Sequence, residues 1–189
     1  MAVLKRRRKP AAMLAALLLG CVLGSVAAAP VPGEYQLKAI FLFNFTQFVE
    51  WPDDAFAGPQ APFVIGVLGE DPFGATLEEA VRGESVGTRT LVVERYRHLA
   101  DLRPCQILFI DRSARPELAA PGRLLDRRGM LTVSDAANPP AADTIIGFIN
   151  ENRRIRLRIN VESAREAGLT ISSKLLRPAQ IIGNPGGDP

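Results

Sequence analysis

The clearest pattern along the chain is a run of apolar positions at helical spacing between residues 37 and 49. These positions are Leu37, Phe41, Phe45, Phe48 and Val49, and three neighbours widen the apolar face, namely Ile40, Leu42 and Phe43. Polar residues at 44, 46 and 47 interrupt the run too often for a membrane span. Pro52 ends it, because proline lacks an N–H and disfavours the helical region for the residue before it. We therefore expect a core helix of a globular domain.

Short apolar runs then alternate with helical segments. Strands are expected at residues 63–68, 90–93, 105–110 and 130–133. Asp71 and Pro72 are expected to begin a helix that Gly83 ends, and Leu118, Leu124 and Leu125 indicate another. This alternation is typical of βαβ units with a mostly parallel sheet.

The pattern changes after residue 143. Residues 144–149 and 155–159 read as two antiparallel strands around a turn at 150–153, because Ile155, Leu157 and Ile159 alternate with arginines. Asn160 is expected to cap a final helix through Ala164 and Ala167 that stops at Gly168, and a further helical turn or two is expected within 171–179. The predicted fold class is α/β, a three-layer domain with a mostly parallel central sheet flanked by helices and a C-terminal antiparallel hairpin.

The N-terminus has the three parts of a secretory signal peptide. Lys5 to Lys9 are five consecutive cations, an uncharged Leu- and Ala-rich stretch follows, and small residues end at Ala28. We expect a signal peptide at 1–28, one domain at 29–182 and a flexible tail at 183–189, in an exported protein. Two alternatives stay open: a retained N-terminal anchor, and lipidation of Cys21, which follows Leu18-Leu19-Gly20 in a sequence that resembles a lipobox.

Removing that segment changes the charge and cysteine arguments. All five N-terminal cations leave with it, so the remaining chain is slightly acidic although the full chain has a net charge of +3. No later segment combines a basic run with aromatics, so we expect no nucleic-acid binding. Cys105 becomes the single thiol, which excludes an intrachain disulfide, and its apolar surroundings predict a buried, inert side chain.

No set of residues in the sequence supplies a nucleophile together with its base. His98 is the only histidine, so no zinc site of ordinary ligand type is expected. Glu78 and Glu79 are adjacent in a predicted helix and face different directions, which rules out a carboxylate pair. We predict a protein that is not an enzyme and has no cofactor or metal.

Several ordered segments carry a family resemblance. They are KAIFLFNFTQFVEWP at 38–52, FVIGVLGEDPFG at 63–74, CQILFI at 105–110, LTVSD at 131–135 and IRLRINVESAREAGLTISSKLL at 155–176. Together they resemble the YfiR family of periplasmic regulators. The resemblance implies an α/β protein that binds and represses the periplasmic sensory part of an inner-membrane diguanylate cyclase, thereby controlling cyclic di-GMP and biofilm formation. Cys105 matches one family cysteine, but its partner is missing, which puts redox control in doubt.

Two surfaces are candidates for function. A partner-binding face is predicted on the hairpin and the segment after Gly168, at Arg154, Ile155, Arg156, Leu157, Arg158, Lys174, Leu175 and Leu176. The alternative is that the apolar members of this set belong to the core. A second hypothesis is a small-ligand sensor or carrier, with a crevice where the parallel strands end, at Gly69, Asp71, Asp111, Ser134 and Asp135. A homodimer is also left open.

Overall fold

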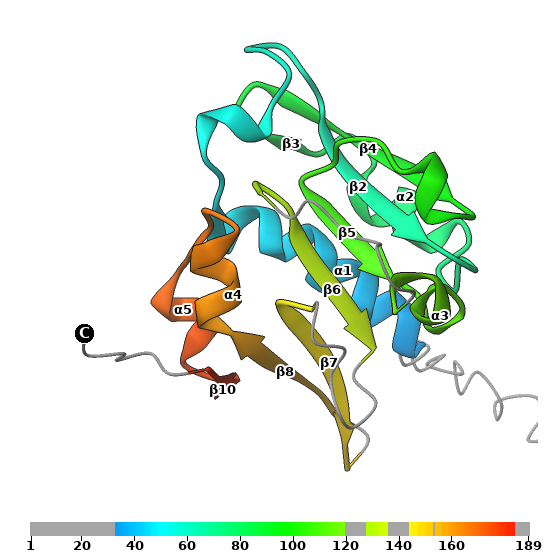
Figure 1. Ribbon diagram of the computed structural model, residues 1–189, viewed down its shortest axis with the longest axis vertical. Coiled ribbons are helices and arrows are strands. Elements are labelled where there is room, and N and C mark those ends of the chain that lie inside the picture. Colours follow the sequence, from blue (N-terminus) through cyan, green and yellow to red (C-terminus); the bar gives the residue numbers. More distant parts are fainter. Residues whose placement is uncertain (1–32, 120–127, 136–143, 153, 184–189) are drawn as a thin grey trace, which may run out of the picture. The chain divides into compact units, whose positions relative to one another are not determined.

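The computed structural model of the protein describes residues 33–119, 128–135, 144–152 and 154–183. Within these residues, an eight-stranded sheet has the order β10-β8-β7-β6-β5-β2-β4-β3, and β1 pairs separately with β9 (Figure 1). The strands are β1 Val49–Glu50, β2 Phe63–Leu68, β3 Ser85–Val86, β4 Arg89–Tyr96, β5 Ile107–Ile110, β6 Leu131–Asp135, β7 Ile146–Glu151, β8 Arg154–Asn160, β9 Thr170–Ile171 and β10 Gln180–Ile182. The helices are α1 Glu34–Phe48, α2 Thr76–Val81, α3 Arg115–Leu118, α4 Val161–Glu166 and α5 Ser173–Leu176, with short 3-10 helices η1 Asp53–Ala55, η2 Leu99–Asp101 and η3 Arg112–Ala114.

The central strands run in one direction. β4, β2, β5, β6 and β7 form successive parallel pairs, while β8 returns antiparallel to β7. β10 then pairs parallel to β8, and β3 pairs antiparallel to β4 at the other edge. The predicted fold class, a mostly parallel sheet with a C-terminal antiparallel hairpin, is confirmed.

Helical segments cover both faces of the sheet. Phe63, Ile65 and Val67 of β2 join the larger core cluster, which also holds residues of α1, α2, α4 and α5. Val64 and Leu68 point to the opposite face, where they pack with residues of β5 and the η2 and η3–α3 segments. Figure 1 shows α1 behind the sheet and α3 in front of it. Side chains that alternate along each strand therefore fill two interfaces, which makes three layers.

The first helix is present, but its buried face is rotated from the predicted one. Its buried residues are Lys38, Ala39, Leu42, Phe45 and Thr46. Leu37 and Ile40 are instead exposed, at 37% and 44%. Apolar residues occur on several sides of this helix, so periodicity alone could not select the side that packs on the sheet.

Other local predictions differ from the structure in ways that contacts explain. The helix expected to start at Asp71 begins at Thr76, because the Asp71 carboxylate accepts a hydrogen bond from Phe73 N in a preceding turn. Asn160 does cap α4, with its side chain accepting from Ser163 N. The helix expected near Leu118 is confirmed only as α3; Leu124, Leu125 and the tail from residue 184 lie outside the described residues. Residues 171–179 contain the end of β9 and then α5, and β10 was not predicted.

Candidate functional site at the carboxyl edge of the sheet

Loops that follow the parallel strands gather most of the predicted crevice residues at one edge of the sheet. Gly69 and Asp71 line a hollow of about 630 Å3 together with residues that follow β4 and β5. Asp111 and Asp135 line a neighbouring hollow of about 440 Å3. Ser134 is not part of either lining, because it is buried and donates a hydrogen bond to Thr144 Oγ1 at 3.1 Å. The two hollows share Glu70 and Ser113.

Close packing of two loops shapes the boundary between these hollows. Gly69 has a φ of +96°, and a Cβ there would lie 2.5 Å from Ser113 Oγ, so glycine is needed for both conformation and space. Ser113 Oγ accepts from Glu70 N at 2.8 Å and donates to Asp111 Oδ2 at 2.7 Å. Asp111 also accepts a hydrogen bond from Ser113 N and so caps η3. The crevice wall is therefore a preformed hydrogen-bonded corner.

An arginine that sequence reasoning did not single out organises the other side of the larger hollow. Arg95 Nε donates a hydrogen bond of 2.7 Å to Asp71 Oδ2. Its two terminal nitrogens donate hydrogen bonds to the Glu78 carboxylate and to the Gly74 carbonyl oxygen. The hydrogen bonds from Arg95 lower the pKa of Glu78. Arg95 thus ties the loop after β2 to β4, and its partners leave it little freedom to bind a ligand.

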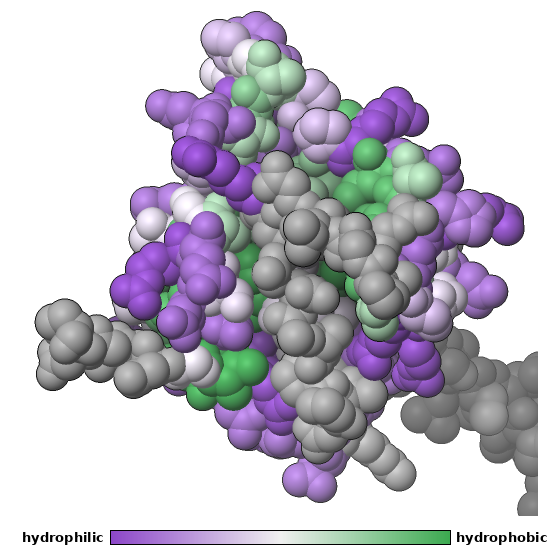
Figure 2. Space-filling model, viewed as in Figure 1, coloured by the Kyte–Doolittle hydropathy of each residue, from purple (hydrophilic) through white to green (hydrophobic). Residues whose placement is uncertain are grey.

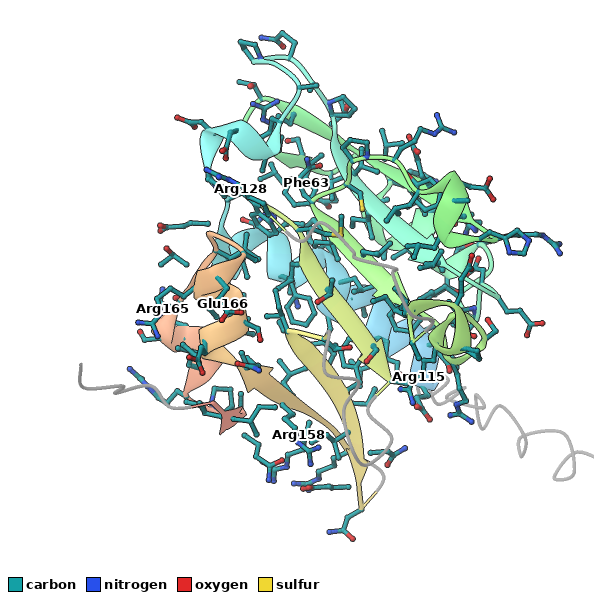
Figure 3. The ribbon with its side chains drawn as sticks, in the orientation of Figure 1. Phe63, Arg115, Arg128, Arg158, Arg165 and Glu166 are labelled. Atoms are coloured by element: carbon teal, nitrogen blue, oxygen red, sulfur yellow. The ribbon has the colours of Figure 1, made fainter. Side chains whose placement is uncertain are left out.

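A buried lysine cluster joins α1 to the end of β6. Lys38 Nζ lies 2.7 Å from Asp135 Oδ1 and also pairs with Glu34, while its side chain is only 4% exposed. Tyr35 donates its hydroxyl hydrogen to Asp135 Oδ2 at 2.9 Å, and burial together with this bond raises the pKa of Tyr35. Arg115 donates to the Asp135 carbonyl oxygen, and Figure 3 shows it between α3 and the end of β6. Asp135, predicted as a crevice residue, is therefore also a structural anchor.

The β7–β8 hairpin reaches the same edge, because β7 runs parallel to β6 and β8 starts where β7 ends. A third hollow of about 310 Å3 is lined by Asp135 and Lys38 on one side and by Asn150 and Ile155 on the other. The structure thus brings the predicted crevice and the start of the predicted partner face together. Figure 1 shows the hairpin extending beyond the neighbouring strands, and the visible surface there is mostly hydrophilic in Figure 2.

The predicted partner face divides into exposed and buried members. Leu157 and Leu175 are in the core, and Ile155 and Leu176 are half-buried against it. The remaining members of the set have exposed or half-exposed side chains: Arg154, Arg156, Arg158 and Lys174. Its well-exposed members are therefore all cationic: Arg154, Arg156 and Lys174.

The thiol is not part of the lining of these hollows, whereas the histidine lines the larger one. Cys105 is buried, and burial raises the pKa of its thiol to about 12. His98 is exposed, with Nδ1 3.9 Å from a Glu117 oxygen.

Within the described ranges, no three acidic, histidine or cysteine side chains are grouped so that they could hold a metal ion. None of the helices in those ranges has the length and apolar character to cross a membrane. Cys21, the predicted lipidation site, lies outside the described residues.

Comparison with known proteins places this fold in a family. A search among curated proteins found no match. The family model described as YfiR/HmsC-like matches residues 35–180, which extend from the first turn of α1 to the start of β10. The chain therefore belongs to the YfiR/HmsC-like family.

Proposed function

We propose that the protein is a periplasmic regulator that binds and represses the sensory part of an inner-membrane diguanylate cyclase. The observation that carries this proposal is the family match over residues 35–180. Loss of the protein would release the cyclase, raise cyclic di-GMP and favour biofilm growth. The proposed partner face is the exposed part of the β7–β8 hairpin, next to the crevice at the carboxyl edge.

The proposal requires export. We infer that residues 1–28 are a signal peptide, that one domain follows at 29–182 and that 183–189 form a tail, on the basis of the cation run and the uncharged stretch after it. N-terminal sequencing of the protein from the envelope fraction tests this directly. A mature chain that starts near Ala29 supports it, whereas an acylated N-terminal Cys21 would replace it with a lipoprotein.

Deleting the gene and measuring cyclic di-GMP tests the regulatory role. The deletion strain should contain more cyclic di-GMP than the parent, and expression of the full chain should restore the parental level. Cross-linking in intact cells should then join the protein to a membrane protein with a cyclase domain. Unchanged cyclic di-GMP in the deletion strain, under conditions in which the protein is produced, would contradict the proposal.

A second candidate function is a small-ligand sensor or carrier without catalytic activity. The hollow of about 630 Å3 at Gly69 and Asp71 favours it, because its size lies within the range of ligand pockets. Thermal melting of the purified protein with a panel of small polar metabolites tests it. Stabilisation that Asp71→Ala removes and Arg82→Ala keeps would support a ligand site there, and a ligand effect on cyclase repression would unite both functions.

A further inference from the structure

We propose that the outer face of the β7–β8 hairpin binds an acidic protein segment. The segment's carboxylates pair with the hairpin arginines, and one apolar side chain between those carboxylates inserts into the hairpin face. This inference rests on the proposed function only for the identity of the partner. The hairpin face is defined here by Ile149, Glu151, Arg154 and Arg156, with the neighbouring residues 178–180.

Charge is the first observation. In the antiparallel register, Arg154 is opposite Glu151 and Arg156 is opposite Ile149, so their side chains share one face of the sheet. Arg154 and Arg156 are both exposed. Glu151, itself half exposed, is the one acid on these paired positions, and it meets Arg156 Nε only at 3.7 Å. The face therefore carries more positive than negative charge and favours carboxylates.

Arg158 belongs to the same face but has a role within the fold. Its Nε donates to Gln180 Oε1 at 2.9 Å and so connects β8 to the edge strand β10. Figure 3 shows Arg158 on β8. We therefore assign recognition to Arg154 and Arg156 and leave Arg158 as a support of the edge.

A small hollow beside Arg156 is the second observation. It measures about 220 Å3 and is lined by Ile149, Glu151, Arg156, Pro178, Ala179 and Gln180. Ile149 and Ala179 are half-buried, so the hollow has apolar walls beneath a cationic rim. An apolar anchor surrounded by charged pairs is a common arrangement in protein interfaces.

The composition of the hairpin tip favours a protein segment over a lipid surface. A loop that enters a membrane interface presents large apolar or aromatic side chains. The described tip residues Asn150, Glu151 and Asn152 are polar, and Glu151 and Asn152 are exposed. Glu151 would also oppose binding to anionic headgroups.

Spacing defines the segment more closely. Two residues on one face of a strand are about 7 Å apart, which separates Arg154 from Arg156. Carboxylates at i and i+4 of a helix are about 6 Å apart along its axis. An acidic amphipathic helix with glutamates at this spacing and a leucine beside them therefore fits the face.

Fluorescence anisotropy with defined probes tests the inference on the purified full-length exported protein. The probe is a labelled helical peptide with i, i+4 glutamates and one leucine. Three comparison probes are used. The first is the same peptide with lysines in place of the glutamates, and the second has serine in place of the leucine. The third is a preparation of vesicles rich in phosphatidylglycerol. The test variant is Arg154→Glu/Arg156→Glu. The matched control is Arg82→Glu/Arg103→Glu, which has the same net charge and alters exposed arginines away from the hairpin.

We expect the acidic peptide to bind the wild-type protein at about 0.1 M salt, more weakly at about 1 M salt. Reversal of both hairpin arginines should weaken binding about tenfold or more, while the control pair changes it less than about twofold. The leucine-to-serine peptide should bind more weakly to both the wild-type and the control protein. Because the apolar anchor is changed in the peptide, this result does not depend on a variant that fails to fold. If circular dichroism shows that the double reversal is unfolded, Arg156→Gln replaces it.

Equal binding of the acidic peptide to the wild-type and double-reversal proteins would overturn the inference. So would binding of the vesicles with no binding of the peptide. In cells, full restoration of cyclic di-GMP repression by the double-reversal protein, in a strain where deletion raised cyclic di-GMP, would also reject it. The two proposals can also separate. If the purified protein binds the peptide through Arg154 and Arg156 but deletion of the gene leaves cyclic di-GMP unchanged, this inference is supported and the proposed regulatory role is rejected.

Discussion

The buried pair of Lys38 and Asp135 allows a sharp test of what holds α1 to the sheet. Lys38 Nζ lies 2.7 Å from Asp135 Oδ1, with side-chain exposures of 4% and 16%. Asp135→Ala leaves the ammonium with Glu34, whose side chain is 46% exposed, and removes the acceptor of the Tyr35 hydroxyl. Removing one partner of a buried pair costs about 3–5 kcal/mol, and the remaining Glu34 contact places our expectation near the lower end, about 3 kcal/mol.

Lys38→Met should be milder, because methionine keeps an unbranched apolar stem against the Tyr35 and Phe148 rings, which Lys38 Nζ approaches to 4.4 Å and 5.9 Å. The double variant should be more stable than the sum of the two single losses predicts, by about 1–2 kcal/mol. Urea unfolding followed by circular dichroism measures all four proteins. The loss in Asp135→Ala corresponds to a melting temperature lower by about 6–12 °C for a domain of this size.

The exposed pair of Arg95 and Glu78 is the control for this cycle. Their side chains are 38% and 41% exposed, so we expect a coupling of about 0.2–1 kcal/mol that decreases toward 1 M salt. The coupling between Lys38 and Asp135 should decrease less in the same salt, because the pair is largely buried and is therefore screened less. Additivity of the two single losses within about 0.5 kcal/mol would refute a direct Lys38–Asp135 coupling.

Three further predictions concern the core, the thiol and acid stability. Phe45→Ala should cost about 3–5 kcal/mol because Phe45 is fully buried, whereas Leu37→Ala should cost well under half of that; equal losses in urea unfolding would contradict the observed face of α1. Cys105 should resist thiol reagents near pH 8 in the folded protein, because its pKa is about 12, and melting should not change with reductant; rapid labelling would contradict its burial. The pKa of Glu78 is lowered in the fold, so its stabilising contribution should be present above its ordinary pKa of 4.5 and lost as pH falls; Arg95→Gln should remove this pH dependence.

The outline of the fold could be predicted from the sequence. Phe63–Leu68 is a strand with the bounds that its apolar run indicated, and all six residues are buried, as a central parallel strand requires. The alternation of isoleucine or leucine with arginine predicted the antiparallel hairpin, because an apolar residue at every second position is typical of a strand with one buried and one exposed face. Local patterns of this kind are decided by backbone geometry and the need to bury apolar side chains.

Short elements with distant partners were not predictable. The strand β10 has only three residues and exists through pairing with β8, while β1 and β9 have two residues each and depend on one another. Segments of two or three residues are too short to show the alternating pattern from which a strand is predicted. Their hydrogen bonds form only after the chain has brought their partners near.

The sequence by itself determined the class of the domain, the hairpin and the residues that end the parallel strands. Tertiary structure decided which of those residues act together. It rotated α1 so that Lys38 is buried against Asp135, and it placed Leu157 and Leu175 in the core rather than on a partner face. It also joined the crevice and the hairpin at one edge, through the hollow between Asp135 and Ile155. The physical reason is that periodicity defines which residues share a face, whereas the packing of many separate segments decides what each face touches.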